Sequence, residues 1–307
     1  MTSPFGPMRL IVSPRANRGG VERALPALRA ALEERALAYQ VAQVGNVEQA
    51  ERAAESALAD GVRFVVVAGD DPTINGVVNG LLTADGSPKR EDTVLGTAWS
   101  GSGSDLPRTF GLDRNPEVVA KHLSTDHTMR IDVGIVELTG LDGEPAQRLF
   151  VNAAEVGWGA HLVRLTARLH WLGRVGRLLA AYGAIRALER QVTAVTLAHT
   201  KATLPVIELV VANGQFIQDA ARIAPRALPD DGKFNVQAFT GNRSQMFVMT
   251  QYIYRGDHLP NPQIVEWQSP TVSLAPVHPL PVVADGFLLG ETPAAFRIVS
   301  QALQLKI

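Results

Sequence analysis

The sequence contains no cysteine, which excludes disulfide bonds, thiolate metal sites and catalysis by a thiol. It also lacks an excess of either charge, since 29 Lys and Arg residues offset 30 Asp and Glu residues, and we therefore expect no nucleic-acid partner. The seven histidines show no spacing typical of zinc ligands. No apolar segment is long enough to span a bilayer, and the N-terminus lacks the pattern of a signal peptide. These absences predict a cytoplasmic protein.

Apolar residues are abundant, at 46% of 307 residues, which predicts a large core and about two domains. Residues 1–125 alternate between short apolar runs and segments with helical periodicity. We expect strands at 9–13, 38–44, 64–67 and 94–99, and helices at 20–37, 47–58 and 73–82. Continuous β-branched runs separated by amphipathic helices predict a parallel, Rossmann-like sheet covered on both faces.

The pattern changes after this region, because strand-like segments dominate residues 126–295. These segments are 130–138, 148–155, 192–199, 206–212, 234–239, 271–275 and 281–283. One helical block at 162–189 interrupts them. The composition favours a second, mostly antiparallel, β-sandwich-like domain. The last residues, 296–307, predict a further strand pair that could return to the first domain.

Three loops rich in glycine and hydroxyl residues follow strands of the first domain, at 13–20, 69–75 and 101–105. Glycine lets the backbone approach a phosphate closely, and the N–H groups of a following helix point at the anion. The carboxyl ends of parallel strands meet at one edge of the sheet. The three loops together therefore favour a nucleotide site, although each alone could be an ordinary strand-to-helix turn.

The order of these loops resembles the diacylglycerol kinase catalytic family, which includes bacterial soluble lipid kinases and sphingosine kinases. The segment Gly69-Asp70-Asp71-Pro72-Thr73 stands where the family has Gly-Gly-Asp-Gly-Thr, and Gly76-Val77-Val78-Asn79-Gly80-Leu81 stands where it has Glu-Val-Val-Asn-Gly-Leu. Residues 101–108 are similar to Gly-Thr-Gly-Asn-Asp-x-Ala-Arg. In the second domain, matches to the family begin at Asn152, Asn213 and Asp285.

The resemblance implies phosphorylation of a lipid hydroxyl, of the diacylglycerol or sphingoid-base class, with ATP and Mg²⁺, and it is compatible with a homodimer. It assigns a catalytic role to Asp71 and nucleotide contacts to Gly69, Asp70, Asp71, Pro72, Thr73, Asn75, Gly101, Ser102 and Gly103. It also implies a structural Mg²⁺ held by the Asp231 carboxylate and the carbonyls of Leu228 and Lys233. The alternative for Asp231 is an Asp-Gly turn.

The chain departs from the family at the residues that the chemistry needs. Phe287 occupies the position of the glutamate that accepts the hydroxyl proton, and phenylalanine cannot accept a proton. Pro72 removes a backbone donor from the hallmark loop, Asp70 adds a second carboxylate, and Gly76 replaces a glutamate. Asp71 followed by Pro72 also predicts an ordinary helix start with Asp71 as N-cap.

These departures predict weak or lost kinase activity. Two alternatives stay open. In one, an active kinase uses Asp285 or Glu291 as its base, although Glu291 lies about 13 Å along the chain from position 287. In the other, the protein is a non-catalytic lipid- or nucleotide-binding regulator.

The helical block Leu162–Arg190 is strongly basic. It contains six arginines and one acid, Glu189, together with Trp171 and Tyr182. Basic charge with aromatic residues is typical of transient contact with an anionic membrane, which would make the protein peripheral. The alternative is a helix pair that packs its apolar stripe on the sheet and leaves its arginines in solvent.

Overall fold

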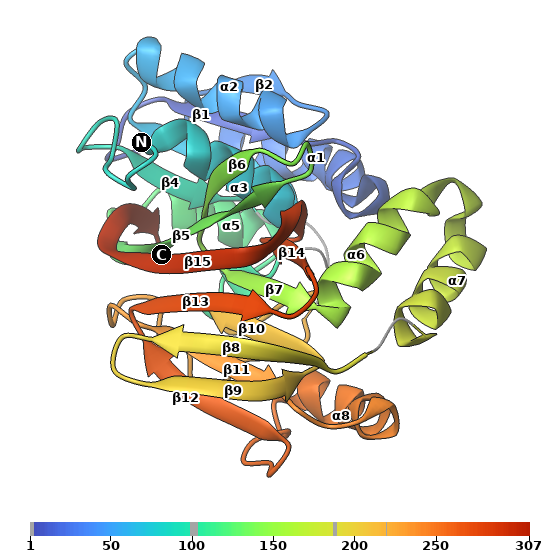
Figure 1. The fold of residues 1–307 in the computed structure, drawn as a ribbon. Helices are drawn as coiled ribbons and strands as arrows, with labels where there is room; N and C mark the ends of the chain where they lie inside the picture. Colours follow the sequence, from blue (N-terminus) through green and yellow to red (C-terminus); the bar gives the residue numbers. More distant parts are fainter. Residues whose placement is uncertain (1–2, 99–103, 187–188, 219) are drawn as a thin grey trace. The chain divides into compact units, whose positions relative to one another are not determined.

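The computed structural model describes residues 3–98, 104–186, 189–218 and 220–307 (Figure 1). The chain divides into two compact units. Unit 1 comprises Met1–Val133, Gln218–Ala220 and Val299–Ile307. Unit 2 comprises Gly134–Ile217 and Ala221–Ile298. Within the described residues, no helix is both long and apolar enough to cross a membrane.

Unit 1 is built on a parallel sheet whose order is β2-β1-β3-β4-β15. The strands are β1 (Met8–Val12), β2 (Tyr39–Gln43), β3 (Phe64–Ala68), β4 (Val94–Thr97) and the end of β15 (Phe287–Lys306). The central strand β3 is buried along its whole length, which explains its continuous Phe-Val-Val-Val-Ala sequence. Its two neighbours in register are β1 and β4.

Helices pack on this sheet at positions set by their apolar stripes. Residues of α1 (Ala16–Glu34) and α5 (Pro116–Leu123) join alternate residues of β1 and β3 in one core. Helices α2 (Val47–Ala59) and α3 (Asp71–Leu81) pack against each other and contact β1 and β3, respectively. A short helix, α4, spans Leu106–Thr109.

Glycines let α2 and α3 approach closely. A Cβ atom at Gly76 would lie 2.4 Å from the carbonyl oxygen of Val47, and one at Gly80 would lie 2.3 Å from that of Glu51. Real Cβ atoms do not approach backbone oxygens so closely, so both positions require glycine unless the helices separate. The glycine at position 76, where the family has a glutamate, is therefore a packing requirement of this chain.

Unit 2 consists of antiparallel sheets. One has the order β12-β11-β10-β7-β14 and continues into the start of β15, and another pairs β9, β8, β13 and the middle of β15. Strand β5 (Thr128–Gly140), which begins in unit 1, pairs with β15 and forms a hairpin with β6 (Pro145–Phe150). The remaining strands are β7 (Ala153–Gly157), β8 (Gln191–Leu197), β9 (Lys201–Val206), β10 (Glu208–Ala212), β11 (Phe234–Phe239), β12 (Ile264–Ser269), β13 (Thr271–Pro276) and β14 (Pro281–Ala284).

The core of unit 2 contains Phe150 stacked on Phe234, with ring centroids 5.6 Å apart, and Phe296 against the edge of Phe150. The fold class expected from the sequence, an N-terminal α/β domain and a C-terminal β-sandwich-like domain, is confirmed.

Several expectations need correction. The expected strand over 148–155 is two strands, β6 and β7, which are separated at residues 151–152, and the expected strand pair at the C-terminus is one continuous strand, β15. The helical block comprises α6 (Trp158–Arg168), a 3₁₀ turn at His170–Leu172 and α7 (Gly173–Arg186). Helix α8 (Arg243–Arg255) lies where the sequence interpretation placed no element, as do the shorter elements α4, α5, β9 and β12.

Candidate functional site

The loop between β3 and α3 forms a capped helix start. The N-cap is Asp70, whose carboxylate accepts hydrogen bonds from the backbone N–H of Thr73 at 3.2 Å and from its hydroxyl. The prediction that Asp71 is the N-cap was therefore wrong by one residue, because Asp71 lies in the first turn, before Pro72. A Cβ atom at Gly69 would lie 2.7 Å from the Thr73 side chain, which explains the glycine there.

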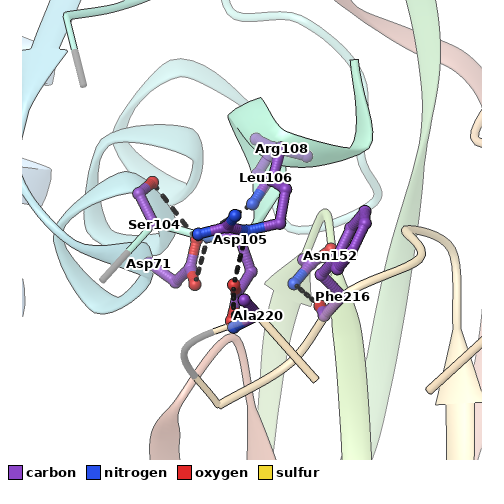
Figure 2. A network of polar contacts seen from close by, with 8 residues as sticks. All are labelled: Asp71, Ser104, Asp105, Leu106, Arg108, Asn152, Phe216 and Ala220. Atoms are coloured by element: carbon purple, nitrogen blue, oxygen red, sulfur yellow. Dashed lines mark hydrogen bonds and ion pairs between the residues drawn. The ribbon is translucent and has the colours of Figure 1, made fainter. Parts of the chain in front are cut away.

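The Asp71 side chain binds another loop of unit 1 (Figure 2). Its carboxylate accepts hydrogen bonds from the backbone N–H of Asp105 at 2.9 and 3.0 Å and of Leu106 at 3.3 Å. The Ser104 hydroxyl lies 3.5 Å away. Asp71 thus holds the segment that leads into α4. A carboxylate that accepts backbone hydrogen bonds at the start of a helix forms charge-assisted hydrogen bonds and interacts favourably with the helix dipole.

Asp105 continues this network. Its side chain is 2% exposed, accepts a hydrogen bond from the backbone N–H of Ala220 at 2.9 Å, and lies 3.6 Å from the Arg108 guanidinium. Asn75 is fully buried inside α3, where its carbonyl accepts from the side chain of Asn79. The predicted nucleotide contacts Gly101, Ser102 and Gly103 lie outside the described residues.

The described carboxylates of unit 1 fit a catalytic magnesium ion poorly. Mg²⁺ requires near-octahedral oxygen ligands. Asp70 serves the α3 cap, while Asp71 and Asp105 accept backbone hydrogen bonds at two different segments. In the part of the chain that the structure describes, no three acidic or histidine side chains converge on a point where an ion could bind.

The motifs of unit 2 meet around Asp285. This residue and Gly286 form the two-residue turn between β14 and β15, with φ angles of 46° and 73°, as an Asp-Gly hairpin requires. The Asp285 carboxylate is 3% exposed and accepts hydrogen bonds from the backbone N–H groups of Val151 (2.9 Å), Asn152 (2.9 Å) and Ala153 (3.2 Å). Asp285 therefore holds the connection between β6 and β7 in place.

Asn152 and Asn213 complete this polar cluster. The side-chain amide of Asn152 donates to the carbonyl of Phe216 at 2.6 Å (Figure 2), and that of Asn213 donates to the carbonyl of Val151 at 2.8 Å. The Asn152 side-chain oxygen is buried and has no hydrogen-bond partner among the described residues. The structure thus brings together three motifs that begin at residues 152, 213 and 285 of the sequence.

Phe287 begins β15 directly after this turn. Its ring is half-buried and lies under the Arg148 guanidinium, whose central carbon is 5.8 Å from the ring centroid. Glu291 pairs with Pro281 at the far end of the hairpin, is about half exposed, and forms an ion pair with Arg164 at 3.3 Å. Glu291 and the buried Asp285 are thus both engaged in contacts with other parts of unit 2.

The predicted structural magnesium site falls on a turn. One oxygen of the exposed Asp231 accepts a hydrogen bond from the backbone N–H of Lys233 at 3.0 Å, and Gly232 between them has a φ of 72°. This geometry is that of an Asx turn. The turn is sufficient to explain the Asp-Gly pair, and a magnesium ion at Leu228, Asp231 and Lys233 stays a prediction.

The sequence interpretation missed a buried carboxyl pair, Glu155 on β7 and Glu208 on β10. Both side chains are 4% exposed and lie on the same face of neighbouring strands, where Glu155 is opposite Val210. One oxygen of Glu208 accepts from the backbone N–H of Gly159 at 2.8 Å, at the start of α6, and the other has no partner among the described residues. Burial and the neighbouring Glu155 raise the pKa of Glu208 well above its ordinary value.

This pair predicts a pH dependence of stability. The unfolded chain loses the Glu208 proton near the ordinary pKa of 4.5, whereas the folded chain retains it to higher pH. The contribution of Glu208 to the free energy of unfolding is therefore most favourable below pH 4.5 and falls as the pH rises. Glu208→Gln should flatten this fall, because the amide needs no proton. Urea unfolding at about pH 5, 7 and 9 measures the effect, with Glu291→Gln as the control. Parallel pH profiles for native and Glu208→Gln chains would contradict it.

Helix α7 presents large apolar side chains to solvent. Trp171, Val175, Leu179 and Tyr182 are 73%, 59%, 48% and 60% exposed and follow helical spacing from the preceding 3₁₀ turn. We call these four residues the α7 stripe. The small residues Ala180 and Ala184 are instead buried. The expectation that the apolar stripe packs on the sheet is therefore wrong for these four residues.

Comparisons with known proteins agree with this fold. The diacylglycerol kinase catalytic domain matches residues 7–136, and the YegS C-terminal NAD kinase beta sandwich-like domain matches residues 152–307, more than half of the chain. A diacylglycerol kinase of Staphylococcus haemolyticus is 23% identical over 309 residues, covering 97% of this chain and 87% of its own. One from Staphylococcus carnosus is 20% identical over 305 residues, covering 97% and 94%.

A crystal structure of a diacylglycerol kinase from Bacillus anthracis superposes with a TM-score of 0.69 at 17% identity, over 99% of this chain and 97% of the other. The likeness of the fold thus extends over both units. With both domain families matched in their usual order, this chain belongs to the diacylglycerol kinase and YegS family of lipid kinases.

Proposed function

We propose that this chain is a lipid-kinase-like protein in which ATP- and Mg²⁺-dependent phosphorylation of a lipid hydroxyl is weak or lost. The observation that carries the proposal is Phe287 at the position of the family's proton acceptor, with its ring against Arg148. General base catalysis contributes about 10²–10⁴-fold to such reactions, and an aromatic ring supplies none of it.

The engagement of the nearby carboxylates supports the same proposal. Asp285 accepts three backbone hydrogen bonds, and removing it from them would leave buried donors unpaired. Glu291 lies at the other end of the β14–β15 hairpin, paired with Arg164. A kinase that recruits either residue as its base would first have to break these contacts.

The sequence and structure of the loop Gly69–Thr73 lead us to propose weaker nucleotide binding as well. Pro72 offers no N–H to a phosphate, and the Asp70 carboxylate at the α3 start adds negative charge where the family has glycine. Asp71 stands at the position of the family's catalytic aspartate. Both of its carboxylate oxygens already accept backbone hydrogen bonds from Asp105 and Leu106. We infer weakened binding of ATP and Mg²⁺ at Gly69–Thr73 and at the following glycine-rich loop.

The substrate or ligand class that we propose is a diacylglycerol or a sphingoid base, by analogy with the family. Labelled ATP, Mg²⁺ and a panel of these lipids incubated with the native chain test the proposal. We expect product formation far below the roughly 1 s⁻¹ of ordinary kinases. Turnover at or above that rate would contradict it. Lipid that remains bound through purification would favour the second candidate, a non-catalytic lipid-binding regulator.

A transient membrane contact is our proposal for the α7 stripe. The same helical block that carries the α7 stripe also carries the exposed arginines Arg168 and Arg186. Apolar and aromatic side chains flanked by arginines suit the interface of an anionic bilayer. The protein would then be cytoplasmic and peripheral.

Vesicle binding tests this contact. With phosphatidylglycerol-containing vesicles, Arg168→Ala with Arg186→Ala should weaken binding by about 30-fold, because each arginine near the surface contributes about 1 kcal/mol. Trp171→Ala should weaken it further, whereas Val277→Ala, at an equally exposed site outside the stripe, should not. Equal sedimentation of all variants with these vesicles would contradict the proposal.

A further inference from the structure

The parallel sheet of unit 1 ends at β2, and one side of this strand has no partner strand among the described residues. On its other side, β2 pairs with β1 along its whole length, from Tyr39 to Gln43. An edge strand of this kind presents a row of backbone N–H and C=O groups to which a further strand can bind.

The hydrogen bonds to β1 fix which backbone groups of β2 lie at the open edge. The N–H of Met8 donates to the carbonyl of Ala38 at 3.0 Å, and the N–H of Val44 donates to the carbonyl of Val12 at 2.9 Å. The N–H and C=O of one residue point to the same side of a strand, and that side alternates from residue to residue. The even-numbered residues therefore face β1. The odd-numbered residues direct both groups to the open edge, and these are Tyr39, Val41 and Gln43.

β2 differs from the other edge strands because it carries neither a charged residue nor a proline. The other described strands with a single partner are β6, β9 and β12. β6 contains Pro145 and Arg148, β9 contains Lys201 and Pro205, and β12 contains Glu266. Charges and prolines on an edge oppose pairing with another chain. The five residues of β2, Tyr-Gln-Val-Ala-Gln, lack this protection.

The spacing of the odd-numbered residues makes this edge complementary to itself. In an antiparallel pair centred on Val41, Val41 lies opposite Val41 of a second copy, and Tyr39 lies opposite Gln43 of that copy. Three residues of each copy then donate one N–H group each, so all the edge groups of β2 are paired. No charge meets a like charge across the pair, because β2 carries none.

We propose that β2 binds β2 of a second copy of this chain in an antiparallel pair about a twofold axis at Val41. The pairing joins the parallel sheets of the two copies into one continuous sheet. It also covers more of Tyr39 and Val41, whose side chains pack against the core of unit 1 and are only partly buried. The inference does not depend on the proposed kinase function.

Proline at position 41 separates pairing from folding. Because the Val41 N–H points to the open edge, Val41→Pro removes no hydrogen bond to β1 but removes one donor of each copy from the pair. In sedimentation equilibrium, the native chain should have twice the 32.9 kDa mass of one copy. Val41→Pro should raise the Kd of the dimer at least about tenfold. Val41→Thr keeps the N–H and the branched side chain, and it should dimerise like the native chain.

The absence of cysteine lets one introduced thiol report the register of the pair. Opposite residues of a hydrogen-bonded antiparallel pair have Cα atoms about 5.5 Å apart, a distance that a disulfide can bridge. Val41→Cys should therefore form a covalent dimer on mild oxidation. Gln43→Cys should not, because the two copies of position 43 lie roughly 14 Å apart in this register.

Three results would overturn the proposal. The first is a native chain that stays monomeric at concentrations up to about 100 μM. The second is a Val41→Pro chain that is folded by circular dichroism and dimerises as tightly as the native chain. The third, which does not require the proline variant to fold, is a Gln43→Cys chain that cross-links as readily as Val41→Cys.

Discussion

Replacing Asp285 by alanine should lower the free energy of unfolding of unit 2 by about 3–5 kcal/mol. The carboxylate is buried and accepts three backbone hydrogen bonds, so its removal leaves three buried donors unpaired at the connection between β6 and β7. Alanine is also strained at the φ of 46° that this turn requires, whereas aspartate tolerates it.

Urea unfolding followed by tryptophan fluorescence measures this loss, since Trp158, Trp171 and Trp267 all lie in unit 2. Glu291→Ala is the matched control, because it removes a carboxylate from the same hairpin whose ion pair is partly exposed. It should cost less than about 1 kcal/mol. If Asp285→Ala were as mild as Glu291→Ala, the carboxylate would be available for other uses, catalysis included, and our structural assignment would be wrong.

Gly80→Ala should destabilise unit 1 by about 3 kcal/mol, although alanine is the better helix former. The added methyl group would lie 2.3 Å from the Glu51 carbonyl oxygen, so α2 and α3 would have to separate. At Gly76, a glutamate like that of the family should prevent unit 1 from folding, because the Val47 carbonyl occupies the place of its Cβ.

Thermal unfolding monitored by circular dichroism gives the result. Gly183→Ala on α7 is the control, since its new methyl would meet only the end of the Leu165 side chain at 3.1 Å. We expect that variant to keep or gain stability. A stabilised Gly80→Ala chain would show that α2 and α3 are not packed as described.

Local sequence patterns predicted much of unit 1. The continuous apolar run Phe64–Val67 could only be a strand buried on both faces, and β3 is buried throughout. The start of α3 was misplaced by one residue because Asp70 and Asp71 are both good N-caps, and proline is accepted in the first turn after either. Asp71 is hydrogen-bonded to the backbone of Asp105, which is distant in the sequence, and Asp70 caps the helix instead.

Elements of unit 2 that depend on distant partners were harder to predict. Helix α8 buries the apolar stripe Met246, Met249 and Ile253, but the apolar residues Val248 and Tyr252 outside that stripe are exposed and obscure its periodicity in the sequence. Its capping box, Asn242 with Gln245, was a second signal that could have identified the helix. Glu155 and Glu208 are 53 residues apart and lie on neighbouring strands. The local sequence of neither strand indicates which strand it pairs with, so the proximity of the two carboxyl groups could not be predicted.

The roles of Asp71 and Asp285 show the same limit. The family pattern marked both residues as chemically important, and the structure shows both as acceptors of buried backbone hydrogen bonds. A carboxylate that binds backbone N–H groups and one that binds a substrate have the same residue type and the same position in a motif. Only the contacts distinguish the two uses.

The central claim is that transfer fails for want of a base at position 287, and one comparison of turnover tests it most directly. A triple variant restores the family residues and leaves Gly76 in place; it carries Asp70→Gly, Pro72→Gly and Phe287→Glu. Replacing the Asp70 N-cap by glycine lowers the free energy of unfolding by only about a few tenths of a kcal/mol. The matched control carries Phe287→Gln in the same background, because glutamine has a similar shape and accepts no proton.

With labelled ATP, Mg²⁺ and the lipid panel, the glutamate variant should form product at least about 100-fold faster than both the native chain and the glutamine control. A native chain that already turns over at about 1 s⁻¹, or a glutamine control as fast as the glutamate variant, would contradict the claim.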